Sequence, residues 1–551
     1  MRKIRLAPWQ LCLAAAIFIV LTANTELYRT LGDRLDLLTA GGLGFLLAIT
    51  LLMVLVLNTV FLVLGVGPLQ KPLIALFLVG SSVFGFFTNR MGVVFDASMF
   101  MNAAETVRDQ NTAEAAELMS LALFVHVLIF GILPALSLGF VELTRRRLLP
   151  EFGLRTVITL AGLLLVAAIT LPNYRNVSFF ARENNELRFK ITPIYPLASL
   201  LAVARDQLRD ERPFTVIDAD ATRSEVVAKR TIGIMVVGET ARADHFSMNG
   251  YDRETNPRLA SMPGILYAHA DSCGTSTLYS VPCMFSMRGR DDYSRQKAAA
   301  ESNVLDILTA AGVQTVWIDN NSSCKGVCAR IENVNLRRNV DESSPYYSDM
   351  GYLDEVLLQS IDPYLQSTGP DLLIVLHTLG SHGPAYSRRY PADFGPFVPS
   401  CDKASPTDCS VAEVRNAYDN TIVYTDFILS QLIDRLKSRS ADFDAFLFYA
   451  SDHGESLGEN GLYLHGMPYA IAPAAQTTVP IIAWLSDGVR ERQRLSPQKL
   501  QQFGNQALSH DNISHTLLGL FDVEASTYVA DLDLFASPDL VMGRADLAAS
   551  Y

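Results

Sequence analysis

Residues 445–453 read Ala445-Phe446-Leu447-Phe448-Tyr449-Ala450-Ser451-Asp452-His453, an apolar run that ends in a carboxylate and an imidazole. Such a run predicts a buried parallel strand, so Asp452 and His453 would emerge at its carboxyl end, where open α/β sheets bind ligands. A carboxylate oxygen beside an imidazole nitrogen suits Zn²⁺. His465 follows a glycine-containing loop and returns toward the same region. For the Asp-His pair alone, a helix-capping aspartate beside a surface histidine is the alternative.

The same α/β pattern covers the chain from Thr231 onward. Other strand-like apolar runs occur at Ile232–Val237, Val313–Ile318, Leu372–Leu376 and Val479–Trp484. Amphipathic helical patterns occur at Val304–Ala311, Leu353–Leu365, Val411–Leu436 and His510–Leu520. Alternating strands and helices predict a largely parallel sheet sandwiched by helices. The residues that carry chemistry should therefore gather at one edge of that sheet.

Two further polar segments fit this edge. Glu239 comes directly after the first strand and its Gly238, which places a carboxylate where it could bind a metal. A hydroxyl-rich turn with Thr275, Ser276 and Thr277 lies between Cys273 and Cys283. A threonine hydroxyl is a poor nucleophile at its free pKa, and coordination to a metal is one way to activate it. Taken alone, these features also fit an ordinary strand end and a capped turn.

The N-terminal third of the chain is strongly apolar. Five spans are long enough, or nearly so, to cross a bilayer, near Trp9–Leu27, Leu43–Val66, Leu73–Phe87, Leu121–Phe140 and Val157–Leu171. Basic residues precede the first span and lie between spans two and three and between spans four and five, which places these regions in the cytoplasm. The loop Arg90–Leu118 and everything after Pro172 are then exported. A cleaved signal peptide is the alternative for the first span, but no convincing small-residue cleavage site follows it.

These patterns predict three parts: a transmembrane domain at residues 1–172, an interfacial linker at 173–230 and an exported catalytic domain at 231–551. The length of 551 residues exceeds one ordinary domain, and 49% hydrophobic residues indicate an apolar segment joined to a soluble one. Aromatic residues in the linker suit a membrane interface, with a plain connection as the alternative. A net charge of −12 without a basic stripe argues against a partner made of nucleic acid.

The cysteines support export independently. Cys12 lies inside the first span, and the other six form three close pairs: Cys273 with Cys283, Cys324 with Cys328, and Cys401 with Cys409. An even number in the exported part predicts disulfides formed in an oxidising compartment. Several connectivities are open to six cysteines, so nearest-neighbour pairing is a hypothesis based on the short loops. A zinc cluster is the rival interpretation, but the paired CxxC spacing is missing.

Four segments of the exported part carry a specific resemblance: Val236–His245, Cys273–Ser286, Ser381–Tyr386 and Ser451–Pro468. In this order they closely resemble the phosphoethanolamine transferases of Gram-negative inner membranes. The lipid A-modifying branch, with EptA and the mobile colistin-resistance enzymes, is the most similar. The resemblance covers nearly the whole chain and implies five membrane spans followed by an exported domain of the alkaline phosphatase and sulfatase superfamily.

The resemblance implies roles for individual residues. The residues that match the family's zinc site are Glu239, Thr277, Asp452 and His453, and Thr277 also matches the nucleophile. His382 and His465 match histidines that bind the donor's phosphate or a second zinc. Lys325 and Ser322 match residues of the donor pocket, and Asn102 and Thr106 fall at the family's spacing in the first exported loop. His377, at the end of its strand, is a further candidate neighbour.

The implied reaction transfers phosphoethanolamine from phosphatidylethanolamine to a phosphate of lipid A, through a covalent threonine intermediate and with one tightly bound Zn²⁺. The implied protein is a monomeric, multi-pass inner-membrane enzyme that acts among membrane lipids, with its catalytic domain in the periplasm, and confers resistance to cationic peptides such as polymyxins. Core sugar, Kdo or a periplasmic glucan could replace lipid A as the acceptor. A lipoteichoic acid synthase-like enzyme would share the spans and the metal-bound threonine. A membrane-anchored binding protein with an inactive enzyme fold is the rival interpretation from a different class.

Overall fold

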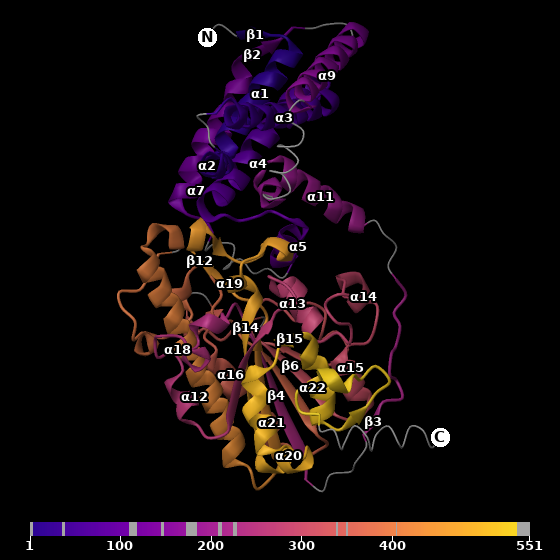
Figure 1. Ribbon diagram of the computed structural model, residues 1–551, viewed down its shortest axis with the longest axis vertical. Helices are drawn as coiled ribbons and strands as arrows, with labels where there is room; N and C mark the ends of the chain where they lie inside the picture. The colour runs from indigo at the N-terminus through magenta and orange to yellow at the C-terminus, as the bar shows by residue number, and fades with distance from the viewer. Residues whose placement is uncertain are drawn as a thin grey trace. The chain divides into compact units, whose positions relative to one another are not determined.

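The computed structural model describes residues 4–35, 39–108, 118–144, 148–171, 185–207, 212–223, 229–337, 340–348, 351–403 and 405–536. The chain forms two compact units. The first comprises Met1–Phe100, Met119–Leu208 and Asn460–Tyr463, and the second comprises Met101–Leu118, Arg209–Glu459 and Leu464–Tyr551. Helices dominate the first unit, and an eight-stranded sheet organises the second (Figure 1).

The helices of the first unit follow the apolar spans of the sequence. Their bounds are α1 (Pro8–Ala23), α2 (Thr25–Arg34), α3 (Ala40–Leu64), α4 (Gln70–Met91), α7 (Leu121–Val127), α8 (Leu133–Ser137), α9 (Leu148–Thr170) and α11 (Ile194–Gln207). Strands β1 (Ile4–Leu6) and β2 (Val141–Leu143) pair in parallel beside them. Three stretches are long and apolar enough to cross a membrane, namely Gly42–Leu64, Gly67–Met91 and Leu121–Phe140.

The first predicted span is bent rather than straight. Helices α1 and α2 meet at 64°, and they add a fourth span if they count as one. The break falls at buried Asn24, whose amide donates to the carbonyls of Val20 and Thr192 and whose carbonyl oxygen accepts the Thr192 N–H. Because these bonds satisfy the side chain at the bend, the chain turns there instead of continuing the helix.

Among the residues that the structure describes, fewer spans than the predicted five are found. The fifth predicted span falls in α9, a helix of 23 residues that is not among the described stretches that meet the requirement. Some side chains of α9 lie outside the part of the chain that the structure describes. The described residues therefore contain three spans, or four with the bent pair.

The sheet of the second unit has the strand order β15-β5-β14-β11-β4-β10-β6-β7. The bounds are β4 (Thr231–Gly238), β5 (Ile265–Asp271), β6 (Gln314–Asp319), β7 (Glu332–Asn335), β10 (Leu372–His377), β11 (Asp444–Ser451), β14 (Thr478–Leu485) and β15 (Leu508–Ser509). Every pairing is parallel except those of β14, which runs antiparallel to β11 and β5. The prediction of a largely parallel sheet is confirmed, with one reversed strand. The stretch 452–477, which the structure describes throughout, contains no long helix, so the crossover that parallel pairing of β11 with β14 needs is missing.

Helices pack on both faces of this sheet, as the alternation of elements predicts. On one face, Ile232, Ile234 and Val236 of β4 pack in a core with residues of α16 (Glu355–Ser360) and α18 (Val411–Ser438). On the other face, Met235 and Val237 pack in a core with residues of α13 (Thr277–Met284), α15 (Val304–Ala310) and α22 (Asp511–Leu520). Figure 1 shows α18 on one side of β4, and α15 and α22 on the other. The helix predicted at Leu353–Leu365 is divided into α16 and α17 (Asp362–Gln366), with Pro363 in the first turn of α17.

Four adjacent strands of this sheet end at the same level. Ser451 of β11 is in register with Gly238 of β4, and His377 of β10 is in register with Val237 of β4 and Asp319 of β6. The residues that follow these strand ends must therefore lie at one edge of the sheet.

Candidate metal centre

Three buried side chains converge at this sheet edge. Glu239 follows β4, and Asp452 and His453 follow β11. Each of the three offers one ligand atom, and these atoms all lie within 4.8 Å of one another. All three side chains are fully buried. The sequence predicts that these residues gather at one sheet edge, and in the structure they meet because β4 and β11 are parallel neighbours that end together.

Thr277 joins the three from the start of α13. Its Oγ1 lies 3.2 and 3.1 Å from the two carboxylate oxygens of Glu239 and 3.4 Å from Nε2 of His453. Ser276 is the N-cap of α13, so Thr277 is the first helical residue. A disulfide joins Cys273 to Cys283 and closes the segment that carries Thr277. The hydroxyl is thus held against the carboxylate and the imidazole from a separate element of the fold.

The backbone sets the orientation of His453. Nδ1 of His453 lies 2.9 Å from the carbonyl oxygen of Gly454, so this nitrogen carries the proton that is donated. In the neutral imidazole, Nε2 then presents its lone pair toward Glu239, Asp452 and Thr277. Gly454 is required here, because a Cβ at this position would lie 2.1 Å from the carbonyl oxygen of Ala475.

The donor set fits a divalent cation. Oδ2 of Asp452 is buried and has no hydrogen-bond partner among the described residues, although Nε2 of His453 lies 3.4 Å away. A buried carboxylate oxygen without a partner is costly unless a positive charge lies nearby. Two carboxylates and one imidazole nitrogen, with a hydroxyl beside them, match the preference of Zn²⁺ for nitrogen and oxygen ligands around an open position.

The protonation equilibria reflect the same crowding of charge. Burial, together with the charge of Glu239, raises the pKa of Asp452 to about 6. Burial acts to lower the pKa of His453, but Asp452 and Glu239 outweigh it and raise this pKa to about 10. Burial acts to raise the pKa of Glu239, but the hydrogen bond and charge of His453 lower it overall. The site therefore favours a cation among its carboxylates.

Two more histidines lie next to this cluster. The ring of His465 is 4.4 Å from that of His453 and 5.6 Å from that of His382, measured between centroids. Nδ1 of His465 lies 2.8 Å from Oε2 of Glu455, and the other oxygen of Glu455 accepts the hydroxyl of Tyr386 at 2.7 Å. Since Glu455 engages Nδ1, Nε2 of His465 is left for a ligand.

The segment after β6 approaches the cluster through an asparagine. The amide of Asn321 donates to Oε2 of Glu239 at 2.8 Å and to the carbonyl of Thr378 at 2.9 Å. The next residue, Ser322, accepts a hydrogen bond from Nζ of Lys325 at 2.8 Å. The structure thereby brings the predicted Ser322 and Lys325 together and connects their segment to Glu239.

Sequence reasoning missed Asn321, Glu455 and Tyr386. Asn321 follows the end of β6, and Glu455 lies two residues after His453, so both occupy strand-end positions that could have been considered. Tyr386 carries no such signal, because only the tertiary contact with Glu455 gives it a role. Buried His377, a predicted neighbour, faces Asp319 at 3.3 Å and lies behind the cluster at the end of β10.

Asn102 and Thr106 fall in α5 (Ala97–Arg108). The side chain of Thr106 lies outside the described residues, and for Asn102 no hydrogen bond to the cluster is found among the described ones. Their assignment to donor binding stays a prediction.

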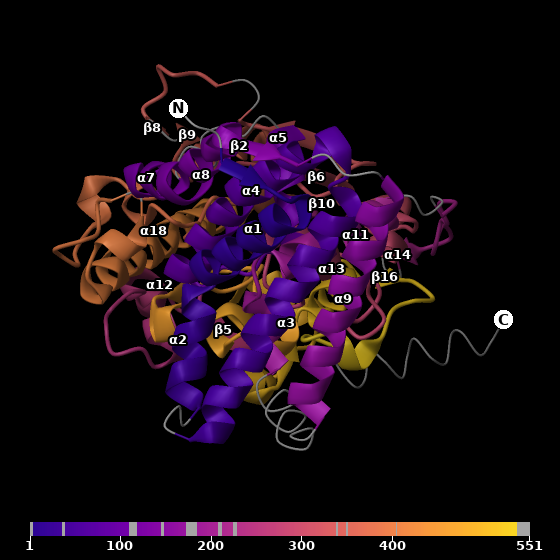
Figure 2. The same ribbon diagram turned by 90° about the horizontal axis from the view of Figure 1, so that it is seen from above.

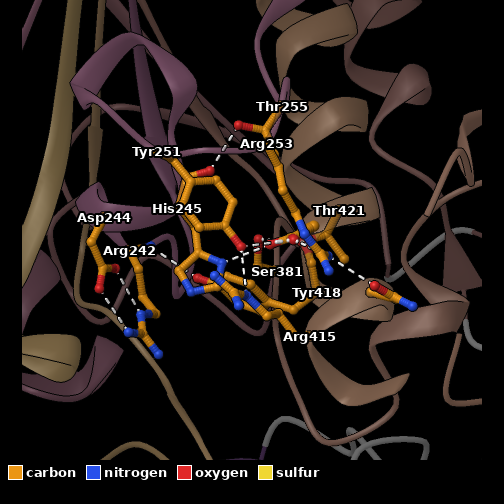
Figure 3. A network of polar contacts seen from close by, with 12 residues as sticks. Arg242, Asp244, His245, Tyr251, Arg253, Thr255, Ser381, Arg415, Tyr418 and Thr421 are labelled. Atoms are coloured by element: carbon orange, nitrogen blue, oxygen red, sulfur yellow. Dashed lines mark hydrogen bonds and ion pairs between the residues drawn. The ribbon is translucent and has the colours of Figure 1, made fainter. Parts of the chain in front are cut away.

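A second polar network holds the segment after Glu239 in place (Figure 3). The guanidinium of Arg242 pairs with both carboxylate oxygens of Asp244, with Glu459, and with the carbonyl of Glu455. Asp419 of α18 accepts from three side chains: His245, Tyr251 and Arg253. The bonds of Arg242 thus connect the segment after β4 to the segment after β11, which carry Glu239, Asp452 and His453, and the bonds of Asp419 connect the segment after β4 to α18.

The predicted cysteine pairs are disulfide-bonded in the structure. The bonds are Cys273–Cys283, Cys324–Cys328 and Cys401–Cys409, with Cα–Cα distances of 6.2, 5.8 and 5.8 Å. Two of them flank predicted site residues, Thr277 and Lys325, so they restrict the segments that present these side chains. The nearest-neighbour hypothesis is confirmed.

Known protein families match both units. A family described as phosphoethanolamine transferase EptA/EptB matches residues 53–208, and the sulfatase family matches residues 232–523. Phosphoethanolamine transferase EptA of Escherichia coli (strain K12) is 36% identical over 540 residues, which is 97% of each chain. Phosphatidylethanolamine transferase Mcr-1 of Escherichia coli is 36% identical over 542 residues, covering 94% of this chain and 96% of that protein.

A solved structure matches nearly the whole chain as well. It is the integral membrane protein lipooligosaccharide phosphoethanolamine transferase A (EptA) from Neisseria meningitidis, which superimposes with a TM-score of 0.91 at 33% identity. The match covers 96% of this chain and 98% of that one.

Proposed function

The chain belongs to the family of EptA-type phosphoethanolamine transferases, and from this membership we propose a specific reaction for it. Phosphatidylethanolamine is the donor, a phosphate of lipid A is the acceptor, and Thr277 is the nucleophile. One observation carries the proposal: the Thr277 hydroxyl lies within 3.4 Å of Glu239 and His453, beside a buried Asp452 oxygen that has no hydrogen-bond partner among the described residues.

The cofactor that this donor set suits best is Zn²⁺. It would be held by Glu239, Asp452, His453 and Thr277. Bound there, it supplies Lewis acidity that favours the alkoxide form of a hydroxyl and draws electron density from a phosphoryl oxygen. A second zinc at His382 and His465 is the alternative to direct phosphate binding by these two histidines.

The transfer proceeds in two displacements. Oγ1 of Thr277 loses its proton and attacks the phosphorus of the donor. The bond from that phosphorus to the diacylglycerol oxygen breaks and this oxygen takes up a proton, so phosphoethanolamine stays on the threonine. A deprotonated oxygen of the acceptor phosphate then attacks the same phosphorus, the bond to Thr277 breaks, and Oγ1 takes up a proton. Diacylglycerol leaves after the first displacement and the modified acceptor after the second.

The cationic side chains around the cluster stabilise the charge that spreads over the phosphoryl oxygens in each displacement. His465 is suited to this role because Glu455 engages its Nδ1 and leaves Nε2 to face a substrate. Lys325, oriented by Ser322, would contribute a second positive charge, and His382 a third. Asn321 holds the Glu239 carboxylate and thereby keeps it toward Thr277.

The apolar helices of the first unit and the three disulfides support an inner-membrane enzyme whose catalytic unit lies in the periplasm, where disulfides form. Both lipid substrates would be delivered within the membrane. Each transfer puts a cationic ammonium group on an acceptor phosphate, which weakens the attraction of the surface for cationic peptides such as polymyxins.

Mass spectrometry of lipid A from a Gram-negative host tests the proposal. The host expresses the intact chain, Thr277→Ala, or Thr425→Ala as a matched control, since Thr425 lies on α18 and bonds only to the backbone carbonyl of Thr421 among the described residues. We expect a phosphoethanolamine-sized addition with the intact chain and the control and none with Thr277→Ala. If lipid A stays unmodified and the labelled group is found on core sugar, Kdo or glucan, that molecule replaces lipid A as the acceptor. If the purified protein contains no zinc and transfers the label to none of these molecules, an inactive binding protein is favoured.

A further inference from the structure

A large cavity lies inside the first unit, between α3, α9 and the segment that precedes α4. Its volume is about 930 Å³, which lies near the upper end of the range of about 300–1,000 Å³ seen for ligand pockets. Helices α3 and α9 lie side by side in both views (Figures 1 and 2). Most of its lining is apolar and includes Leu62, Val63, Val66, Phe152 and Leu160. Several of these side chains are also exposed on the outer surface of the helices, so the cavity is accessible from the lipid phase.

Two charged residues line this mostly apolar cavity. Glu151 and Arg155 of α9 form an ion pair, with Nε of Arg155 3.0 Å from Oε1 of Glu151. Both are more than nine-tenths buried. Arg155 also donates to the backbone carbonyls of Leu62 and Gly65, which anchors its guanidinium against the end of α3. Buried charges are costly unless they are paired and fully hydrogen-bonded.

The ion pair leaves one acceptor unsatisfied. Oε2 of Glu151 is buried and has no hydrogen-bond partner among the residues that the structure describes. A carboxylate oxygen in this position has a strong preference for a donor, above all a cationic one. The cavity that this residue lines therefore provides an acceptor at one point, the positive charge of Arg155 beside it, and an apolar volume for the rest of a ligand.

The cavity lies at the first residue of α4, at the opposite end of this helix from Met91. Gln70, the first residue of α4, lines it, whereas α4 ends at Met91, where the chain enters the loop Arg90–Leu118. The 22 residues of α4 span about 33 Å, roughly the hydrocarbon thickness of a bilayer. The cavity is thus separated from the end of α4 at Met91 by about the thickness of a bilayer.

We propose that this cavity holds a phospholipid with an ammonium headgroup, a phosphatidylethanolamine, as a resident lipid of the membrane unit. The ammonium donates to Oε2 of Glu151, the phosphate lies toward the charge of Arg155, and an acyl chain fills the apolar volume between α3 and α9. A zwitterionic head matches a site with one negative and one positive side chain, whereas an anionic lipid would place its charge next to Glu151. The proposal does not depend on the transfer reaction at Thr277.

Native mass spectrometry of the full-length protein tests this. The protein is reconstituted into nanodiscs with equal amounts of phosphatidylethanolamine and phosphatidylglycerol, released into detergent, and weighed with its retained lipid. The variants are Glu151→Gln, which keeps the shape but removes the charge, and Thr159→Phe, which places a bulky ring in the lining of the cavity. Val157→Phe is the matched control, because Val157 is on the same helix, is 62% exposed and does not line the cavity.

We expect the unmodified protein and Val157→Phe to retain one phosphatidylethanolamine, preferred over phosphatidylglycerol by about tenfold, as one charge-assisted hydrogen bond allows. Thr159→Phe should lose the retained lipid, and Glu151→Gln should lose the preference. Equal retention by Thr159→Phe and Val157→Phe would overturn the site. Retention of phosphatidylglycerol or diacylglycerol by the unmodified protein would overturn the headgroup assignment. If Glu151→Gln does not fold, the two phenylalanine variants decide the question, since both leave the ion pair in place.

Discussion

His453 presents one ring nitrogen to the cluster because the backbone engages the other. Its Nδ1 bonds to the carbonyl of Gly454, and its Nε2 faces Glu239, Asp452 and Thr277. A second hydrogen-bonded group behind a ligating histidine is usual in metal sites, since it determines the tautomer and the ring orientation. At the scale of single residues, the orientation of a proposed ligand is therefore set by a hydrogen bond to a residue that is not itself a proposed ligand.

Asp452→Asn should remove bound metal. The amide lacks the charge that a divalent cation needs, so we expect the affinity for zinc to fall by more than about 100-fold, beyond the effect typical of residues that only support ligands. Elemental analysis of the purified full-length protein measures the zinc content. Asp434→Asn, at an exposed position of α18, serves as the control and should keep its zinc. Full zinc content in Asp452→Asn would exclude this carboxylate as a ligand.

Glu455→Gln should reduce the rate while leaving the metal in place. The glutamine can no longer accept strongly from Nδ1 of His465 and the hydroxyl of Tyr386 at once, so His465 loses its orientation. We expect kcat/KM for transfer from a labelled donor to fall by about 10- to 100-fold.

The zinc content of Glu455→Gln distinguishes this role from a structural one. It should equal that of the unmodified protein, and Glu413→Gln, a change in the capping box of α18, should alter neither quantity. A parallel loss of zinc and rate in Glu455→Gln would instead place Glu455 in the support of the metal cluster.

At the scale of elements, α22 joins two segments that carry the site. His510, directly before α22, accepts the backbone N–H of Cys273 on Nδ1 at 3.0 Å and faces the carbonyl of Ser451 with Nε2 at 2.9 Å. Cys273 begins the segment of Thr277, and Ser451 ends β11 next to Asp452. Only the neutral ring can make both bonds, since Nδ1 must accept and Nε2 must donate.

The neutral state of His510 predicts a pH dependence of stability. Burial lowers the pKa of His510 from 6.5 to about 3 in the folded protein. The unfolded chain then binds a proton below about pH 6.5 that the folded chain does not, so stability falls as pH decreases from 6.5 toward 3. Between pH 7 and pH 5, this single group should lower the free energy of unfolding by about 2 kcal/mol.

Thermal or denaturant unfolding of the full-length protein and of His510→Gln measures the effect. The glutamine can replace both hydrogen bonds but does not titrate, so the variant should lose about 2 kcal/mol less between pH 7 and pH 5 than the unmodified protein. At pH 7 the variant should be less stable by about 1 kcal/mol, because its bonds are not ideally placed. Identical pH profiles would show that His510 is not the group that titrates.

At the scale of the whole molecule, we expect the apolar unit to determine which substrates the second unit meets. The second unit has its own cores on both faces of the sheet, so a chain of residues 212–551 should fold without the first unit. When exported on its own, this chain should bind zinc but modify lipid A at least about 100-fold less than the full chain, because it loses the high local concentration of both lipids.

The measurement is the fraction of modified lipid A at equal amounts of exported protein. A Thr277→Ala version of the short chain gives the background. Modification equal to that of the full chain would mean that the helices are only an anchor, and that substrate supply does not depend on them.

Local signals in the sequence were enough to predict three kinds of feature. These are the strands of the parallel core, the helices and the three disulfides. An apolar run such as Ala445–Ala450 is recognisable without knowledge of its neighbours, and short loops favour the observed cysteine pairs. Parallel strands place their carboxyl ends at one edge, so the gathering of Glu239 and Asp452 at that edge could be predicted, whereas the pairing of β4 with β11 that brings them together could not. Motif resemblance, rather than physical pattern, identified Thr277, His382 and Lys325 as members of the same site.

Only the tertiary structure decided the reversed direction of β14, the bend at Asn24 and the bonds that orient the site. The links from Asn321 to Glu239 and from His510 to Ser451 connect residues that are 82 and 59 positions apart. Such contacts depend on strand register and on how helices pack across the sheet, and neither leaves a periodic signal in the sequence. The sequence by itself thus determined which residues reach the sheet edge, and packing decided how each one is held there.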